Sequence, residues 1–68
     1  MSVKNRLLEI RLNLGYKKQK DFAEYLGFKQ PQYNKLENNV SQLTLDQLFL
    51  VARKLKININ DIVFYEDE

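Results

Sequence analysis

The chain has 68 residues, enough for one domain with a small hydrophobic core. It contains no cysteine and no histidine, which excludes disulfides, thiolate metal sites and catalysis that depends on histidine. Its net charge of +2 is unevenly spread, because residues 1–35 hold eight basic and three acidic residues and residues 36–68 hold three basic and six acidic ones. The first part is therefore either a face for an anionic partner or an ordinary solvated surface.

Membrane insertion and catalysis find no support in the sequence. No stretch approaches the roughly 20 apolar residues of a membrane span, and charges interrupt the first 15 residues, unlike a secretory signal peptide. No glycine loop suited to phosphates is present, and so short a chain has little room for a sizeable pocket. We therefore expect a soluble, cytoplasmic protein that is not an enzyme and needs no cofactor, metal, membrane or small-molecule substrate.

The first predicted helix runs over residues 2–14. Ser2 is a candidate N-cap, and Gly15 is a candidate C-terminal stop. Leu8 and Leu12 widen the apolar stripe, which predicts a helix buried on more than one side. The stripe itself, at spacings of four, three and four residues, consists of Val3, Leu7, Ile10 and Leu14.

Two short helices are predicted next, over residues 19–26 and 30–38. Gly27 can take a positive φ and so end the first of them in a tight turn. Pro31 fits only the first turn of the second. The residues expected to point inward from the two helices are Phe22, Ala23, Leu26, Tyr33 and Leu36.

A polar loop over residues 38–43 leads to a fourth predicted helix. Thr44 and Gln47 form a capping-box pattern at its start. A second cap signal over residues 58–61 opens a short fifth helix, and residues 66–68 are expected to be a disordered acidic tail. The residues expected to point inward are Leu45, Leu48, Phe49, Ala52 and Leu55 in the fourth helix and Ile59, Ile62 and Val63 in the fifth.

The segment 19–38 meets the demands of two helices that cross steeply through a tight turn. Ala23 supplies a small residue at the crossing, Gly27 supplies the turn, and Phe28 plugs the corner behind it. This segment resembles the helix-turn-helix of the Cro and phage-repressor family, also called the XRE family. The resemblance covers nearly the whole chain, including R-L-L-E-I-R-L-N-L-G (6–15), L-E-N (36–38), T-L-D-Q-L-F-L-V-A-R-K-L (44–55) and I-N-I-N-D-I (57–62).

The resemblance implies an all-α, five-helix, lambda-repressor-like DNA-binding domain over residues 1–65. It also implies a transcriptional regulator, expected to be a repressor, that binds double-stranded DNA through its third helix. Asn39 stands where the family commonly has a glycine, and asparagine tolerates a left-handed backbone. The alternative is a protein-interaction module of the same fold, such as an antitoxin or a partner of another regulator.

The resemblance also assigns DNA contacts. In this family the third helix enters the major groove, where glutamine can pair with adenine and lysine with guanine. Gln30 precedes a proline, which disfavours the α conformation and suggests the helix cap. The residues expected to contact base edges are Lys29, Gln30, Gln32 and Lys35. Those expected to contact the DNA backbone are Lys17, Lys18, Gln19, Lys20 and Asn38, and ordinary solubility is the alternative role of the lysines.

Two further expectations concern structure and assembly. By resemblance, Arg11 and Glu37 form a structural ion pair between the first helix and the end of the third. Many relatives bind two-fold operators as dimers. Leu50, Phe64 and Tyr65 are candidate contacts of a weak homodimer, although Phe64 and Tyr65 can equally cap the small core.

Overall fold

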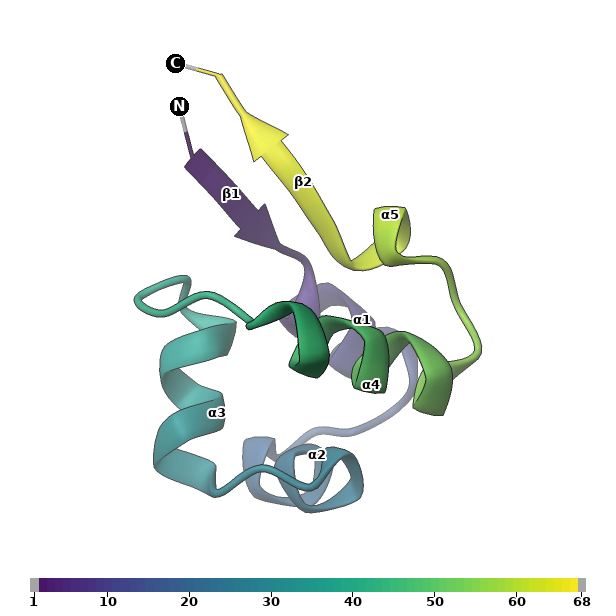
Figure 1. The fold of residues 1–68 in the computed structure, drawn as a ribbon. Coiled ribbons are helices and arrows are strands. Elements are labelled where there is room, and N and C mark those ends of the chain that lie inside the picture. Colours follow the sequence, from purple (N-terminus) through teal and green to yellow (C-terminus); the bar gives the residue numbers. More distant parts are fainter. Residues whose placement is uncertain (1, 68) are drawn as a thin grey trace.

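The computed structural model describes residues 2–67. In chain order its elements are β1 (Ser2–Asn5), α1 (Leu7–Asn13), α2 (Gln19–Leu26), α3 (Gln30–Glu37), α4 (Leu45–Leu55), α5 (Ile59–Ile62) and β2 (Val63–Glu66). Figure 1 shows the five helices as one body, with α4 in front of α1. The two strands project from this body as a ribbon. No helix in residues 2–67 is long and apolar enough to cross a membrane.

The antiparallel ribbon of β1 and β2 corrects the prediction of an all-α fold. Its register pairs Ser2 with Glu66, Val3 with Tyr65 and, at the other end, Asn5 with Val63. The sequence carries little local sign of this pairing, because each strand has four residues and its partner lies at the other end of the described chain. Glu66, expected in a disordered tail, belongs to β2, and Glu68 lies outside the described residues.

The start of α1 at Leu7 corrects the prediction of a helix that begins at Ser2. Asn5 is the last residue of β1, and its side chain binds the start of α1. Its Oδ1 accepts a hydrogen bond from the Leu7 backbone N–H at 3.0 Å, and its Nδ2 donates to the Leu36 carbonyl at 2.7 Å. The buried Asn5 amide therefore satisfies a free N–H at the helix start and ties that start to α3.

The apolar stripe expected of the first helix is buried only in its middle. Leu7 is fully buried and Ile10 is half-buried. Val3 lies in the ribbon, and Leu8 and Leu12, which suggested burial on a second side, point largely into solvent. Since seven residues make only two helical turns, one narrow face of α1 is enough to close the core.

The helix-turn-helix of α2 and α3 confirms the prediction for residues 19–38. Gly27 has φ = 91°, and its N–H and that of Phe28 both donate to the Ala23 carbonyl, which closes the end of α2. Asn39, after α3, also has a positive φ, of 60°, as expected of an asparagine in a glycine-like place. The buried residues of the pair are Phe22, Ala23, Leu26, Tyr33, Leu36 and Glu37.

The fourth helix begins at the predicted capping box but turns a different set of residues inward. Thr44 Oγ1 accepts from the Gln47 N–H at 3.1 Å, and Gln47 Oε1 accepts from the Thr44 N–H at 2.9 Å. Leu45 and Phe49, expected inside, are 74% and 59% exposed. Val51 is fully buried in their place, because Leu48, Val51, Ala52 and Leu55 form the face that meets the core.

We expect Gly27→Val to lower the free energy of unfolding by about 1–3 kcal/mol, because valine disfavours a positive φ. A Cβ at Gly27 meets no atom within 4 Å, so the cost comes from the backbone and not from a clash. Thermal and urea unfolding measure it. Gly27→Asn is the matched control, since asparagine tolerates this conformation. Equal stability of the two variants would contradict the role of the turn.

Candidate functional site

The outward face of α3 carries polar and basic side chains and no exposed carboxylate. Lys29, Gln30, Gln32 and Lys35, the residues predicted to contact bases, are all exposed. The one acidic residue of the helix, Glu37, is buried. The exposed surface therefore suits an anionic ligand, with amides available for hydrogen bonds.

The cap of α3 is Lys29 and not Gln30. Lys29 has an extended backbone with ψ = 145°, and Gln30 is the first helical residue, with Pro31 directly after it. The structure thus places Gln30 in the helix despite the disfavoured conformation before a proline. Gln30 and Lys35 still lie together, since both line an open hollow with Gln19, Pro31 and Asn34.

A second open hollow lies on the other flank of α3. Pro31 and Lys35 line both hollows, so they form the ridge between them. The second hollow brings Lys29 and Gln32 beside the loop that follows α3 and the start of α4, where its lining includes Ser41, Gln42 and Thr44. The predicted base contacts are therefore spread over both sides of one ridge.

The residues predicted to contact the DNA backbone gather at the start of α2. Lys17, Lys18 and Lys20 are exposed, and Lys18 is the N-cap of α2 with an extended backbone. Gln19 is half-buried because its side chain turns toward α3. Asn38 is exposed at the other end, directly after α3.

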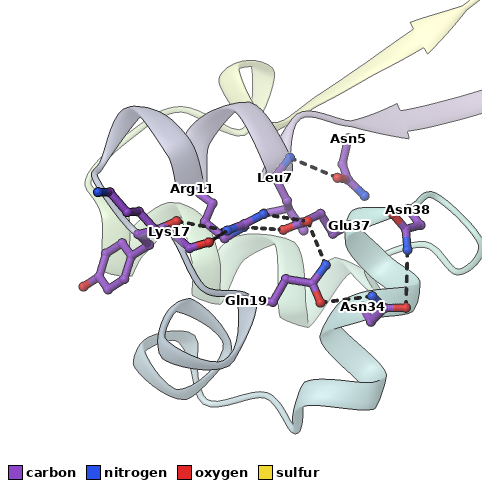
Figure 2. A network of polar contacts seen from close by, with 9 residues as sticks. Asn5, Leu7, Arg11, Lys17, Gln19, Asn34, Glu37 and Asn38 are labelled. Carbon is purple, nitrogen blue, oxygen red and sulfur yellow. Dashed lines mark hydrogen bonds and ion pairs between the residues drawn. The ribbon is translucent and has the colours of Figure 1, made fainter.

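A buried ion pair stands behind this surface (Figure 2). Arg11 Nε lies 2.8 Å from Glu37 Oε2, and Arg11 Nη2 donates to Glu37 Oε1 at 3.2 Å, so the guanidinium holds the carboxylate with two parallel bonds. Arg11 and Glu37 are only 7% and 6% exposed. The pair joins α1 to the end of α3, which are the elements that the family resemblance assigned to it.

Arg11 also holds the loop between α1 and α2. Its Nη1 donates to the backbone carbonyls of Tyr16 at 3.0 Å and Lys17 at 2.8 Å. These bonds fix the chain just before Lys18 and Gln19, so one side chain positions the start of α2 as well as the end of α3.

A chain of side-chain amides runs outward from Glu37 (Figure 2). Gln19 Nε2 donates to Glu37 Oε1 at 2.9 Å, and Gln19 Oε1 accepts from Asn34 Nδ2 at 3.0 Å. Asn34 Oδ1 in turn accepts from Asn38 Nδ2 at 3.3 Å. Since a carboxylate only accepts hydrogen bonds, Glu37 sets the orientation of every amide in the chain.

The surroundings of the ion pair shift three pKa values. Burial opposes the charge of Glu37, but hydrogen bonds from Arg11 and Gln19 and the positive charge of Arg11 outweigh it and lower the pKa of Glu37. The same hydrogen bond raises the pKa of Arg11. Burial, followed by the nearby Glu37 carboxylate, raises the pKa of Tyr33, whose hydroxyl has no hydrogen-bond partner among residues 2–67.

Asn34 and Asn5 have roles that the sequence did not predict. Asn34 is exposed on α3, and its bond to Gln19 spans 15 residues and leaves no local pattern. Asn5 does have a recognisable signal, since asparagine shortly before a helical stripe is a frequent start residue. Its N–H also donates to Asn39 Oδ1 at 2.9 Å, which ties β1 to the loop after α3.

The three candidate dimer contacts do not share one surface. Leu50 lies on α4, is 42% exposed and lines a hollow with Phe49 and Ile57. Phe64 lines a different hollow and packs under the Arg6 guanidinium, 4.3 Å from the ring centre. Tyr65 follows Phe64 in β2 and so points to the opposite face of the ribbon.

Comparison with known proteins identifies a family. A family model described as helix-turn-helix matches residues 7–62, from the first residue of α1 to the last of α5. No curated protein and no solved structure matches the chain. The family match covers the buried ion pair, the amide chain and the exposed face of α3.

We expect Glu37→Gln to lower the free energy of unfolding at pH 7 by roughly 3 kcal/mol, because it leaves the buried Arg11 without its countercharge. The lowered pKa of Glu37 stabilises the wild type above the unfolded pKa of about 4.3, and this contribution is lost as the pH falls through the folded value. Urea unfolding from neutral to acidic pH should therefore show a flatter pH dependence in the variant.

Glu24→Gln is the control for this experiment, since Glu24 is exposed on α2. It should keep both the stability and the acid dependence of the wild type. If Glu37→Gln instead kept the full acid dependence of the wild type, the stability below neutral pH would have to come from other carboxylates.

Proposed function

The chain belongs to the Cro and phage-repressor type of helix-turn-helix proteins, a family of DNA-binding transcription regulators. On this premise we propose that the chain is a repressor whose helix α3 contacts base edges in the major groove. The observation that carries the proposal is the outward face of α3, where exposed amides and lysines stand without a carboxylate. Amides and lysines are the side chains that pair with adenine and guanine edges.

Base contacts are proposed for Lys29, Gln30, Gln32 and Lys35. Gln30 and Lys35 share a hollow with Gln19 and Asn34, so a base edge placed there would meet both. Lys29 and Gln32 line the second hollow. Proposed base contacts on both sides of the ridge of Pro31 and Lys35 suit a helix that lies in the major groove, because base edges are then within reach on each side of the helix.

Backbone contacts are proposed for the start of α2 and the end of α3. Lys17, Lys18 and Lys20 supply positive charge around the first N–H groups of α2, which favour an anion. Gln19 stands among them, and Asn38 lies beyond the other end of α3. This set would fix the position of α3 on the duplex without selecting a sequence.

We also propose that two copies bind one two-fold operator. One domain of this size makes few base contacts, and joining two on one DNA raises the affinity through effective concentration. Each copy would then occupy one half-site, with the two α3 helices about 34–36 Å apart on one side of the duplex. The candidate contacts between the copies are Leu50 on α4 or Phe64 and Tyr65 in β2, which lie on different surfaces of the chain.

Gln30→Ala should weaken binding to the best site by about 1–3 kcal/mol and relax the preference at one base pair, because it removes a base contact. Lys18→Ala should weaken binding to all sequences alike and reduce the slope of log affinity against log salt by about one, because it removes a phosphate contact. Selection from a random duplex pool supplies the site, and titrations at several salt concentrations supply the slopes.

Identical behaviour of the two variants across sequences would refute the division into base and backbone contacts. Lys56→Ala is a matched control, since Lys56 is an exposed lysine at the end of α4, remote in the chain from the proposed contacts. Its affinity and salt slope should match those of the wild type. A selected pool that stays random, together with unchanged binding in every variant, would refute sequence-specific DNA binding itself.

The selected site should be a palindrome occupied by two chains. Sedimentation of the protein with that duplex measures the stoichiometry, and the selected sequences show the symmetry. One chain per site, in a site without two-fold symmetry, would rule out the dimer.

A further inference from the structure

The outer face of α4 carries two apolar side chains between two opposite charges. Phe49 and Leu50 are 59% and 42% exposed, although both are large hydrophobic residues. Asp46 precedes them in the first turn of the helix and Arg53 follows them in the last. All four line one open hollow, together with Ala52 and Ile57. In Figure 1 α4 lies in front of α1, and no other element covers it.

Neither charge is paired within the described chain, although each lies at the end of α4 where it favours the helix dipole. Among residues 2–67, no ion pair involves Asp46 or Arg53. They are seven residues apart on the helix, which separates their backbones by about 10 Å along the axis and keeps them from pairing with each other. An exposed apolar pair flanked by two charges without an ion-pair partner suits a protein partner better than solvent.

The order of these residues makes the face complementary to itself. The four residues are arranged symmetrically about the midpoint between Phe49 and Leu50. Asp46 lies three residues before Phe49, and Arg53 lies three residues after Leu50. A two-fold axis through that midpoint, at right angles to α4, would bring a second α4 alongside in the antiparallel direction. Asp46 of each copy then meets Arg53 of the other, and Phe49 and Leu50 pack around the axis.

We infer that this face, formed by Asp46, Phe49, Leu50 and Arg53, binds the same face of a second copy of the chain. The inference rests on the two-copy operator complex proposed above and names the surface that would join the copies. A parallel arrangement or a shift of one helical turn would bring like charges together or leave both pairs open. The opposed helix dipoles of two antiparallel helices favour the same arrangement.

The α4 face is a better site for a second copy of the chain than the edge of the β1–β2 ribbon is. β2 has only four residues and is followed by Asp67, so an antiparallel pair of β2 strands would be short and would carry two carboxylates, Glu66 and Asp67, at each end. Asn39 already covers part of the β1 edge through its bond to the Asn5 N–H. On α4 the charges alternate in sign across the axis, and the apolar pair lies at its centre.

The experiment exchanges the two charges and needs no DNA. Asp46→Arg alone sets a new arginine against Arg53 of the other copy, and Arg53→Asp alone sets a new aspartate against Asp46 of the other copy. Each variant therefore repels its own copy. Mixed in equal amounts, the two variants regain both opposite-charge pairs. Sedimentation equilibrium between about 10 µM and about 1 mM covers the affinity expected for so small a contact.

We expect the wild type to form a weak dimer, each single variant to associate at least about tenfold more weakly, and the mixture to recover to within about threefold of the wild type. Asp21→Arg makes the same charge change in the first turn of α2 and should leave association unchanged. Circular dichroism establishes that each variant folds. A monomeric wild type, single variants that associate like the wild type, or a mixture without recovery would each overturn the inference.

The outcome stays separate from DNA binding. A folded monomeric variant that still binds one half-site supports both proposals. A dimer that obeys the charge exchange but binds no duplex supports the α4 contact and refutes the proposed function.

Discussion

The buried ion pair of Arg11 and Glu37 is the constraint on which the rest of the structure depends. Its carboxylate lies at the end of α3, its guanidinium comes from α1, and the same guanidinium holds two carbonyls of the loop before α2. Desolvating both charges is costly, and the cost is offset only when every polar atom of the pair is bonded. The pair is therefore stable in one arrangement of α1, α2 and α3, which apolar packing alone would not specify so narrowly.

This constraint extends to the surface that we propose contacts DNA. Glu37 orients Gln19, Gln19 orients Asn34, and Asn34 orients Asn38, each by a single hydrogen bond whose direction is fixed. Exposed amides normally sample both orientations at little cost. Here a buried negative charge selects one of them before any ligand arrives, so the entropy of ordering these side chains is lost on folding and not on binding. Glu37, which is buried, thereby shapes the exposed surface proposed to contact DNA.

The parts of the fold that could be predicted from sequence are those written in local patterns. The turn at Gly27, the capping box at Thr44 and the inward residues of α2 and α3 each follow from spacing or from backbone preference over a few residues. The ribbon was missed because Val3 and Leu7 happen to have helical spacing, while the true partner of Val3 is Tyr65. At the site, residue types indicated the exposed set, but the link between Gln19 and Asn34 depends on how two helices cross and has no signal in either helix alone.

The ribbon has a consequence for the order of folding. Ser2 pairs with Glu66, so forming β1 and β2 closes a loop that contains all five helices. Closing so long a loop costs entropy that a pair of four-residue strands offsets poorly, whereas α2 and α3 meet across a turn of only a few residues. We therefore expect the helices to assemble before β1 and β2 pair. In native-state hydrogen exchange the amide protons of the ribbon should be among the first to be replaced, ahead of those in α2 and α4.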